Sequence, residues 1–112
     1  MSLPLRELRG PVKALFSDID GTLTSQGRIE GATYVALERL GEAGIPVVLV
    51  TGRPAGWGQA FMSVAPVAAV VTENGGVTFV REGRRLRKRY GVPPATLPEW
   101  RRRMLECASE IA

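Results

Sequence analysis

The chain has 112 residues, 45% of them apolar, and a formal net charge of +4. This length suits one domain or a piece of one, and the apolar fraction is sufficient for a hydrophobic core, which excludes a disordered chain. No apolar run reaches the roughly 18 residues of a membrane span, and residues 1–11 lack the apolar block of a secretory signal. The single cysteine, Cys107, and the absence of histidine exclude an internal disulfide and His-based catalysis. A reducing cytoplasm is the expected location.

Three short apolar segments predict β-strands. Residues 12–17 are rich in β-formers and predict a mostly buried strand that ends at Asp18. Residues 45–50 form a continuous apolar run, which is typical of a parallel strand covered on both faces. Residues 67–72 predict a third buried strand.

Two helices are predicted between these strands. The first has Thr33 near its start and Gly44 as its C-terminal stop, and the second follows Pro54, which suits a first helical position. Their expected apolar stripes are Ala36, Leu37, Leu40 and Ala43 in the first helix, and Trp57, Phe61 and Val64 in the second. Alternation of strand and helix predicts an α/β fold with a Rossmann-like parallel sheet, of which this chain supplies a three-stranded portion.

The C-terminal third has a different pattern. Residues 77–80 and 86–90 flank a Gly83-containing turn and predict a β-hairpin rich in basic residues. Residues 96–99 predict a capping box that starts an amphipathic helix. Its apolar stripe, expected to pack against the core or a cap, comprises Leu97, Trp100, Met104, Cys107 or Ala108, and Ile111. We therefore divide the chain into an N-terminal extension (1–11), a partial α/β core (12–80), and a hairpin and helix (81–112) that resemble the start of a cap.

Asp18 and Asp20 are the only aspartates, and both follow the first predicted strand. Ligands bind at the carboxyl ends of strands in an open parallel sheet. One carboxylate there can attack a phosphoryl group when a cation neutralises the charge, and a second can transfer protons. Gly21 lets backbone N–H groups approach a phosphate closely, and Thr22 is expected to steady the turn.

The string Asp18-Ile19-Asp20-Gly21-Thr22-Leu23 resembles the first motif of the haloacid dehalogenase (HAD) superfamily. Thr51-Gly52-Arg53 resembles the second motif in its type II, sugar-phosphatase-like form, and Glu73-Asn74-Gly75-Gly76 resembles an element of the same subgroup. Each string follows one predicted strand, in the family's order, over residues 12–80.

The resemblance implies a Mg²⁺-dependent phosphohydrolase that acts on a small phosphorylated metabolite. Asp18 would form an aspartyl-phosphate and bind Mg²⁺, and Asp20 would act as general acid and base and offer its backbone carbonyl to the metal. Thr51 and Gly52 would hold the phosphate. Arg53 and Asn74 would orient the substrate, with Glu73 as a weaker candidate.

The family's later lysine and acidic motif have no counterpart here, because no aspartate follows Asp20 and Lys88 lies in a basic hairpin. We therefore expect poor turnover by the isolated chain. The resemblance also implies a central first strand, so its apolar edge should be covered by the N-terminal segment, the last helix or another copy.

Two alternatives remain. The chain could be a non-catalytic remnant of the fold, or a subunit that needs a partner. Nucleic-acid binding is disfavoured, because the arginine-rich tail lacks interleaved aromatic residues. That tail comprises Arg81, Arg84, Arg85, Arg87, Lys88, Arg89, Arg101, Arg102 and Arg103.

Overall fold

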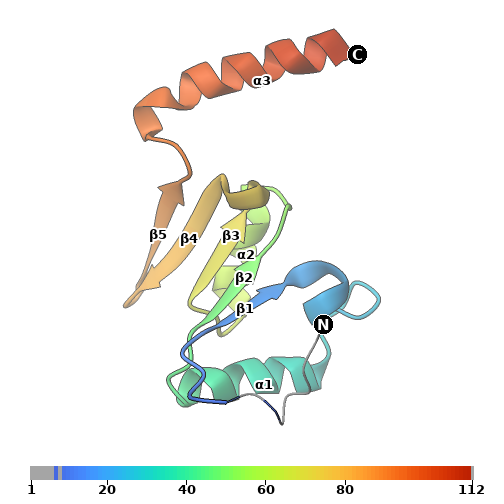
Figure 1. Cartoon of the computed structure of the whole chain (residues 1–112), viewed down its shortest axis with the longest axis vertical. Coiled ribbons are helices and arrows are strands. Elements are labelled where there is room, and N and C mark those ends of the chain that lie inside the picture. The colour runs from blue at the N-terminus through green and yellow to red at the C-terminus, as the bar shows by residue number, and fades with distance from the viewer. Residues whose placement is uncertain (1–6, 8, 112) are drawn as a thin grey trace.

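The computed structural model describes residue 7 and residues 9–111. It contains one five-stranded sheet in the order β1-β2-β3-β4-β5, so that each strand pairs with its neighbour in sequence (Figure 1). The strands are β1 (Leu15–Asp18), β2 (Val47–Val50), β3 (Ala69–Thr72), β4 (Val77–Glu82) and β5 (Arg85–Tyr90). The helices are α1 (Gly31–Glu42), α2 (Ala55–Val64) and α3 (Leu97–Ile111).

The α/β prediction is confirmed. Strands β1, β2 and β3 are parallel, whereas the hairpin of β4 and β5 extends the same sheet in antiparallel fashion. The hairpin turn contains Gly83, whose φ of 60° lies in the left-handed region. Most of the predicted N-terminal extension lies outside the described residues, and the proposed domain division stays a prediction.

Both early helices cover one face of the sheet. The core cluster contains Val47 and Leu49 of β2, Val70 of β3, and Phe79 of β4, which the pairing register places in adjacent positions on a common face. Leu37 of α1 and Met62 of α2 complete this cluster. Right-handed crossovers explain the arrangement, because two that advance across a sheet in the same direction place their helices on the same side.

Helix α2 approaches the sheet through Gly58 rather than through the predicted stripe. A Cβ atom at Gly58 would come within 2.6 Å of Thr72 Cγ2 and 2.7 Å of the Phe79 ring. The buried residues of α2 are Gly58 and Met62, whereas Trp57 and Val64 are 47% and 67% exposed. The predicted stripe was wrong for those two residues, because a glycine at a close contact gives no hydrophobic signal in the sequence.

The second face of the sheet is open in the described chain. Phe16 of β1 pairs with Val48 of β2, and Asp18 pairs with Val50, so these four residues alternate with the core positions. Phe16 is 68% exposed and Val50 is 38% exposed. The predictions that residues 12–17 are mostly buried and that residues 45–50 are covered on both faces were therefore wrong for this chain.

Helix α3 extends from the end of the hairpin, on the opposite side of the sheet from β1 (Figure 1). None of its residues is buried, and Trp100, Met104 and Ile111 are 46%, 68% and 87% exposed. The expectation that this stripe packs against the core was wrong. The predicted capping box is also replaced, since the Thr96 hydroxyl donates to the carbonyl of Pro93 at 2.7 Å.

None of the helices within residues 9–111 combines the length and the apolar character needed to cross a lipid bilayer.

Candidate active site

The three motif loops meet at the carboxyl ends of the parallel strands. Asp18 is the last residue of β1 and pairs with Val50, the last residue of β2, which in turn pairs with Val71 of β3. Thr51 directly follows β2, and Glu73 directly follows β3. Sheet register therefore brings the three polar strings to one edge, as the sequence predicted.

The loop after β1 is a turn at Ile19–Leu23 that starts from Asp18, and the backbone angles of Asp20 and Gly21 within it are not helical. The Asp18 carboxylate accepts a hydrogen bond from the N–H of Ile19 at 2.8 Å, and the Ile19 side chain is fully buried. Gly21 adopts a φ of 74°, which a residue with a Cβ atom reaches only at a cost. Burial of the Ile19 side chain therefore fixes the backbone between the two exposed aspartates.

Thr24, rather than Thr22, closes this turn. Its hydroxyl accepts from the Gly21 N–H at 3.2 Å and donates to the Ile19 carbonyl at 3.1 Å. The Thr24 N–H also donates to the Ile19 carbonyl, at 3.0 Å. The residue predicted for this task was Thr22, because Thr24 lies one residue beyond the motif. The polar residues that follow Leu23 in the sequence were the signal that could have indicated Thr24.

Asp20 and Arg53 join the first loop to the second. Arg53 Nε donates to Asp20 Oδ2 at 2.8 Å, and its Nη2 bonds the other carboxylate oxygen. This hydrogen bonding holds the pKa of the Asp20 carboxyl below its usual value and raises the pKa of Arg53. Both side chains remain partly exposed, at 50% and 31%, so solvent screens the pair.

The second and third loops are tied together through their backbones. Glu73 N–H donates to the Arg53 carbonyl at 3.0 Å, and Asn74 N–H lies 3.4 Å from the Thr51 carbonyl. Gly52 allows this approach, because a Cβ atom there would lie 2.9 Å from Asn74 Oδ1. The loop after β3 therefore supports the loop after β2.

Thr51 is almost completely buried, with 4% of its surface exposed. Its hydroxyl oxygen accepts from the Arg53 N–H at 3.1 Å, which fixes the direction of the side chain and leaves the hydroxyl proton free to be donated. This arrangement is that of a capping turn between a strand and a helix, and it is also compatible with donation to a phosphate oxygen.

Glu73 and Asn74 occupy the left-handed backbone region, with φ of 52° and 54°. Gly75 follows with a φ of 99°. Non-glycine residues in this region carry strain, which is concentrated at turns and functional sites. Residues 73–76 therefore form a tight turn, which presents the Asn74 side chain to Gly52.

Lys88 makes its contacts with aromatic rings of the hairpin and not with the motif loops. Its Nζ lies 5.2 Å from the Tyr90 ring centroid and 5.9 Å from that of Phe79. Arg81 of the same hairpin donates to the Met62 carbonyl. These two cations of the basic cluster thus have structural contacts.

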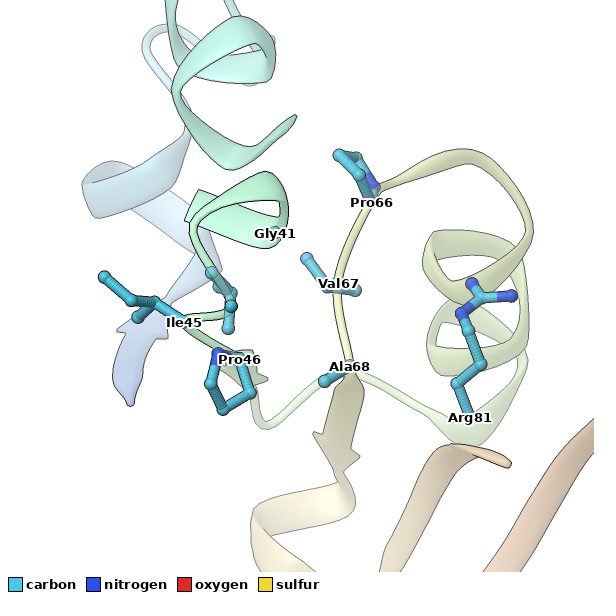
Figure 2. A pocket seen from close by; sticks show the side chains of 9 residues that line it. Gly41, Ile45, Pro46, Pro66, Val67, Ala68 and Arg81 are labelled. Carbon is cyan, nitrogen blue, oxygen red and sulfur yellow. The ribbon is translucent and has the colours of Figure 1, made fainter. Parts of the chain in front are cut away.

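A cavity of about 570 Å³ lies at the opposite end of the sheet. Figure 2 shows it between the turn that precedes β2 and the segment that precedes β3, with Pro46 and Val67 among its lining residues. Among the described residues, Arg81 is the only charged one that lines it. This cavity is remote in the fold from the motif loops and is not part of the candidate site.

Comparisons with known proteins agree with this fold and site. The sequence profile of the haloacid dehalogenase-like hydrolases matches residues 15–99. The chain belongs to this family. It is 37% identical over 73 residues to a phosphoglycolate phosphatase of Methanothermobacter thermautotrophicus, a match that covers 63% of this chain and 33% of that protein.

Solved structures of the family give the same result. A sugar phosphatase of HAD subclass IIB superposes with a TM-score of 0.52 at 35% identity, over 66% of this chain and 30% of that one. A HAD phosphatase from Bacteroides thetaiotaomicron superposes with a TM-score of 0.60 at 27% identity, over 89% and 36%. The chain thus spans about a third of the length of these relatives.

Proposed function

We propose that this chain carries the nucleophile-bearing part of a Mg²⁺-dependent phosphohydrolase that acts on a small phosphorylated metabolite through an aspartyl-phosphate. The observation that carries the proposal is the junction of three loops at one sheet edge. There, Asp20 is bonded to Arg53, and Arg53 and Thr51 are bonded to the loop after β3. Similarity to a phosphoglycolate phosphatase and to a sugar phosphatase supports the substrate class.

In the proposed reaction, an Asp18 carboxylate oxygen attacks the phosphorus atom and the ester P–O bond breaks. Asp20, once released from the contact with Arg53 that favours its charged form, carries a proton and donates it to the departing oxygen, which leaves as an alcohol. A water molecule then attacks the aspartyl-phosphate and gives a proton to Asp20, which releases inorganic phosphate and restores Asp18. Thr51 and the backbone N–H groups near Gly21 and Gly52 would hold the phosphoryl oxygens.

The donors at this edge suit Mg²⁺. This ion prefers oxygen ligands and is commonly held by one or two carboxylates, with water and substrate phosphate completing the shell. One oxygen of Asp18 accepts from Ile19, and the other would bind the metal together with the Asp20 carbonyl. The ion would neutralise charge between the nucleophile and the phosphate.

The rival proposal is a non-catalytic remnant or a subunit completed by a partner. It is favoured by one observation: within the described part of the chain, no three acidic, cysteine or histidine side chains cluster as a metal site. Poor turnover by the isolated chain is expected on either proposal.

Cys107, an exposed free thiol, suits the reducing cytoplasm that we propose as the location of the chain.

Beryllofluoride trapping distinguishes the two proposals without requiring turnover. Beryllofluoride bonds to an aspartate carboxylate and mimics the phosphoryl group. We expect the chain to bind it only when Mg²⁺ is present, with a bound signal in the ¹⁹F NMR spectrum. Failure to bind at millimolar Mg²⁺, by a chain that is folded by circular dichroism, would reject the phosphohydrolase proposal.

We also propose that further polypeptide covers β1 by adding a parallel strand at its free edge and a helix on the open face. Within the described residues, no strand pairs with the outer edge of β1. Strands added outward from β1 would advance in the opposite direction from β2 and β3. Right-handed crossovers would then place their helices on the open face. One added strand with its helix would therefore cover both the free edge of β1 and the open face of the sheet. Pairing of two copies through β1 would leave the open face of each copy exposed.

We expect the purified chain to self-associate through this open face and Phe16→Lys to weaken the association roughly 10- to 150-fold, because burial of a phenylalanine contributes roughly 1.5–3 kcal/mol. Sedimentation velocity over a concentration series measures this change. Val64→Lys is the matched control, since Val64 is 67% exposed on α2 and Phe16 is 68% exposed on β1. Equal effects of the two substitutions on self-association would show that the copies do not associate through the open face.

A further inference from the structure

The guanidinium group of Arg53 lies over the indole ring of Trp57. The Arg53 Cζ atom is 4.3 Å from the ring centroid, within the range of a cation–π contact. Trp57 belongs to the first turn of α2, and Arg53 precedes that helix by two residues. The start of α2 therefore brings an aromatic surface under a side chain of the second motif loop.

Trp57 is itself supported by Phe61. The two ring centroids are 6.1 Å apart, with planes inclined at 34°, which is a favourable tilted arrangement. Phe61 is partly buried and packs against the core cluster. A continuous row of contacts thus runs from the core through Phe61 and Trp57 to Arg53, and from Arg53 to both carboxylate oxygens of Asp20.

The exposure of Trp57 argues against a role in the core. The ring is 47% exposed, whereas its neighbour in sequence, Gly58, forms the close contact with the sheet. Meanwhile, a free arginine side chain loses considerable rotamer entropy when it is held in one geometry. Stacking on a supported ring restricts the guanidinium before it meets its carboxylate, and so reduces that loss.

We propose that Trp57 is a positioning residue, which holds Arg53 in the orientation that fixes the Asp20 carboxylate at the site edge. Its catalytic meaning rests on the proposed function, in which Asp20 transfers protons to and from the reacting oxygens. The physical contact itself does not rest on that function. Trp57 acts through Arg53 and is not placed against the substrate.

The molecule contains a matched control in Trp100 of α3. Trp100 is 46% exposed and has Arg103 Cζ 5.5 Å from its ring centroid, so it resembles Trp57 in exposure and in having an arginine partner. It belongs to α3 and lines a cavity of about 450 Å³ together with Glu73 and Gly76 of the third motif loop, but its arginine partner is Arg103 and not Arg53. A general loss of aromatic surface would affect both positions alike.

NMR spectroscopy of the ¹⁵N-labelled chain tests the proposal through the Arg53 Nε–H group, assigned by its disappearance in Arg53→Lys. We expect Trp57→Ala to remove the ring-current shift of this signal and to speed its exchange with solvent about threefold to fivefold, the factor of an exposed cation–π contact. Trp57→Phe should restore most of the protection. Trp100→Ala should leave the Arg53 signal unchanged.

An Arg53 signal that is unchanged in Trp57→Ala, or that changes equally in Trp100→Ala, would overturn the proposal. Backbone amide spectra verify that each variant is folded, and Trp57→Phe supplies a milder change at the same position. Failure of beryllofluoride trapping by the native chain would instead reject the phosphohydrolase function. The two failures are distinct, because the Arg53 measurement requires neither metal nor phosphate analogue.

Discussion

Asp18→Asn is expected to abolish Mg²⁺-dependent trapping of beryllofluoride. The substitution removes the anionic oxygen that would bond to the analogue and to the metal, while an asparagine Oδ1 can still accept the hydrogen bond from Ile19 N–H. The turn should therefore stay folded. Loss of the carboxylate–metal attraction is worth at least about 3 kcal/mol, which corresponds to roughly 100-fold in affinity. Titration followed by ¹⁹F NMR measures the change.

Asp20→Asn is the control for this prediction. It neutralises the neighbouring aspartate and weakens the contact with Arg53, yet it leaves the Asp18 carboxylate intact. We expect it to retain trapping with a smaller loss of affinity. If Asp18→Asn bound the analogue as well as the native chain, the nucleophile assignment would fail.

Gly58→Ala is expected to destabilise the chain by about 1–3 kcal/mol, because an added methyl group in a packed interface forces its neighbours to move. The nearest atoms belong to the side chains of Thr72 and Phe79, both buried in the sheet. Thr72 is also fixed by a hydrogen bond of 2.7 Å from its hydroxyl to the Val77 carbonyl. Urea unfolding followed by circular dichroism measures the free energy of unfolding.

Gly56 provides the comparison within the same helix. A Cβ atom at Gly56 meets no heavy atom within 4 Å, and its backbone is helical. Gly56→Ala should therefore stabilise the chain by about 0.5–1 kcal/mol, through lower conformational entropy of the unfolded state. Destabilisation of similar size by the two substitutions would contradict the close approach of α2 at Gly58.

The motif loops could be located from the sequence because each follows an apolar segment with a clear boundary. Asp18, Thr51 and Glu73 all directly follow or end a strand, as expected from the strings that contain them. Gly44 also ends α1 as predicted, with a φ of 75°. Local signals of this kind depend on a few adjacent residues and can therefore be recognised in a single sequence.

Contacts between distant segments could not be read in the same way. The Asp20–Arg53 pair joins residues 33 positions apart, and its bidentate geometry depends on the register of β1 with β2. The burial of β1 was overestimated because apolar composition indicates a tendency to be covered, without specifying which segment supplies the cover. The apolar stripe of α3 led to the same overestimate.

The order of the strands has a consequence for folding during synthesis. Since each strand pairs with the one made just before it, the sheet can grow in the order of synthesis, although each parallel pairing must wait for the helix between its two strands. The last of the three motif loops ends at Gly76. A nascent chain that had emerged up to this residue would already contain all three motif loops, and later segments would meet loops that are already in place.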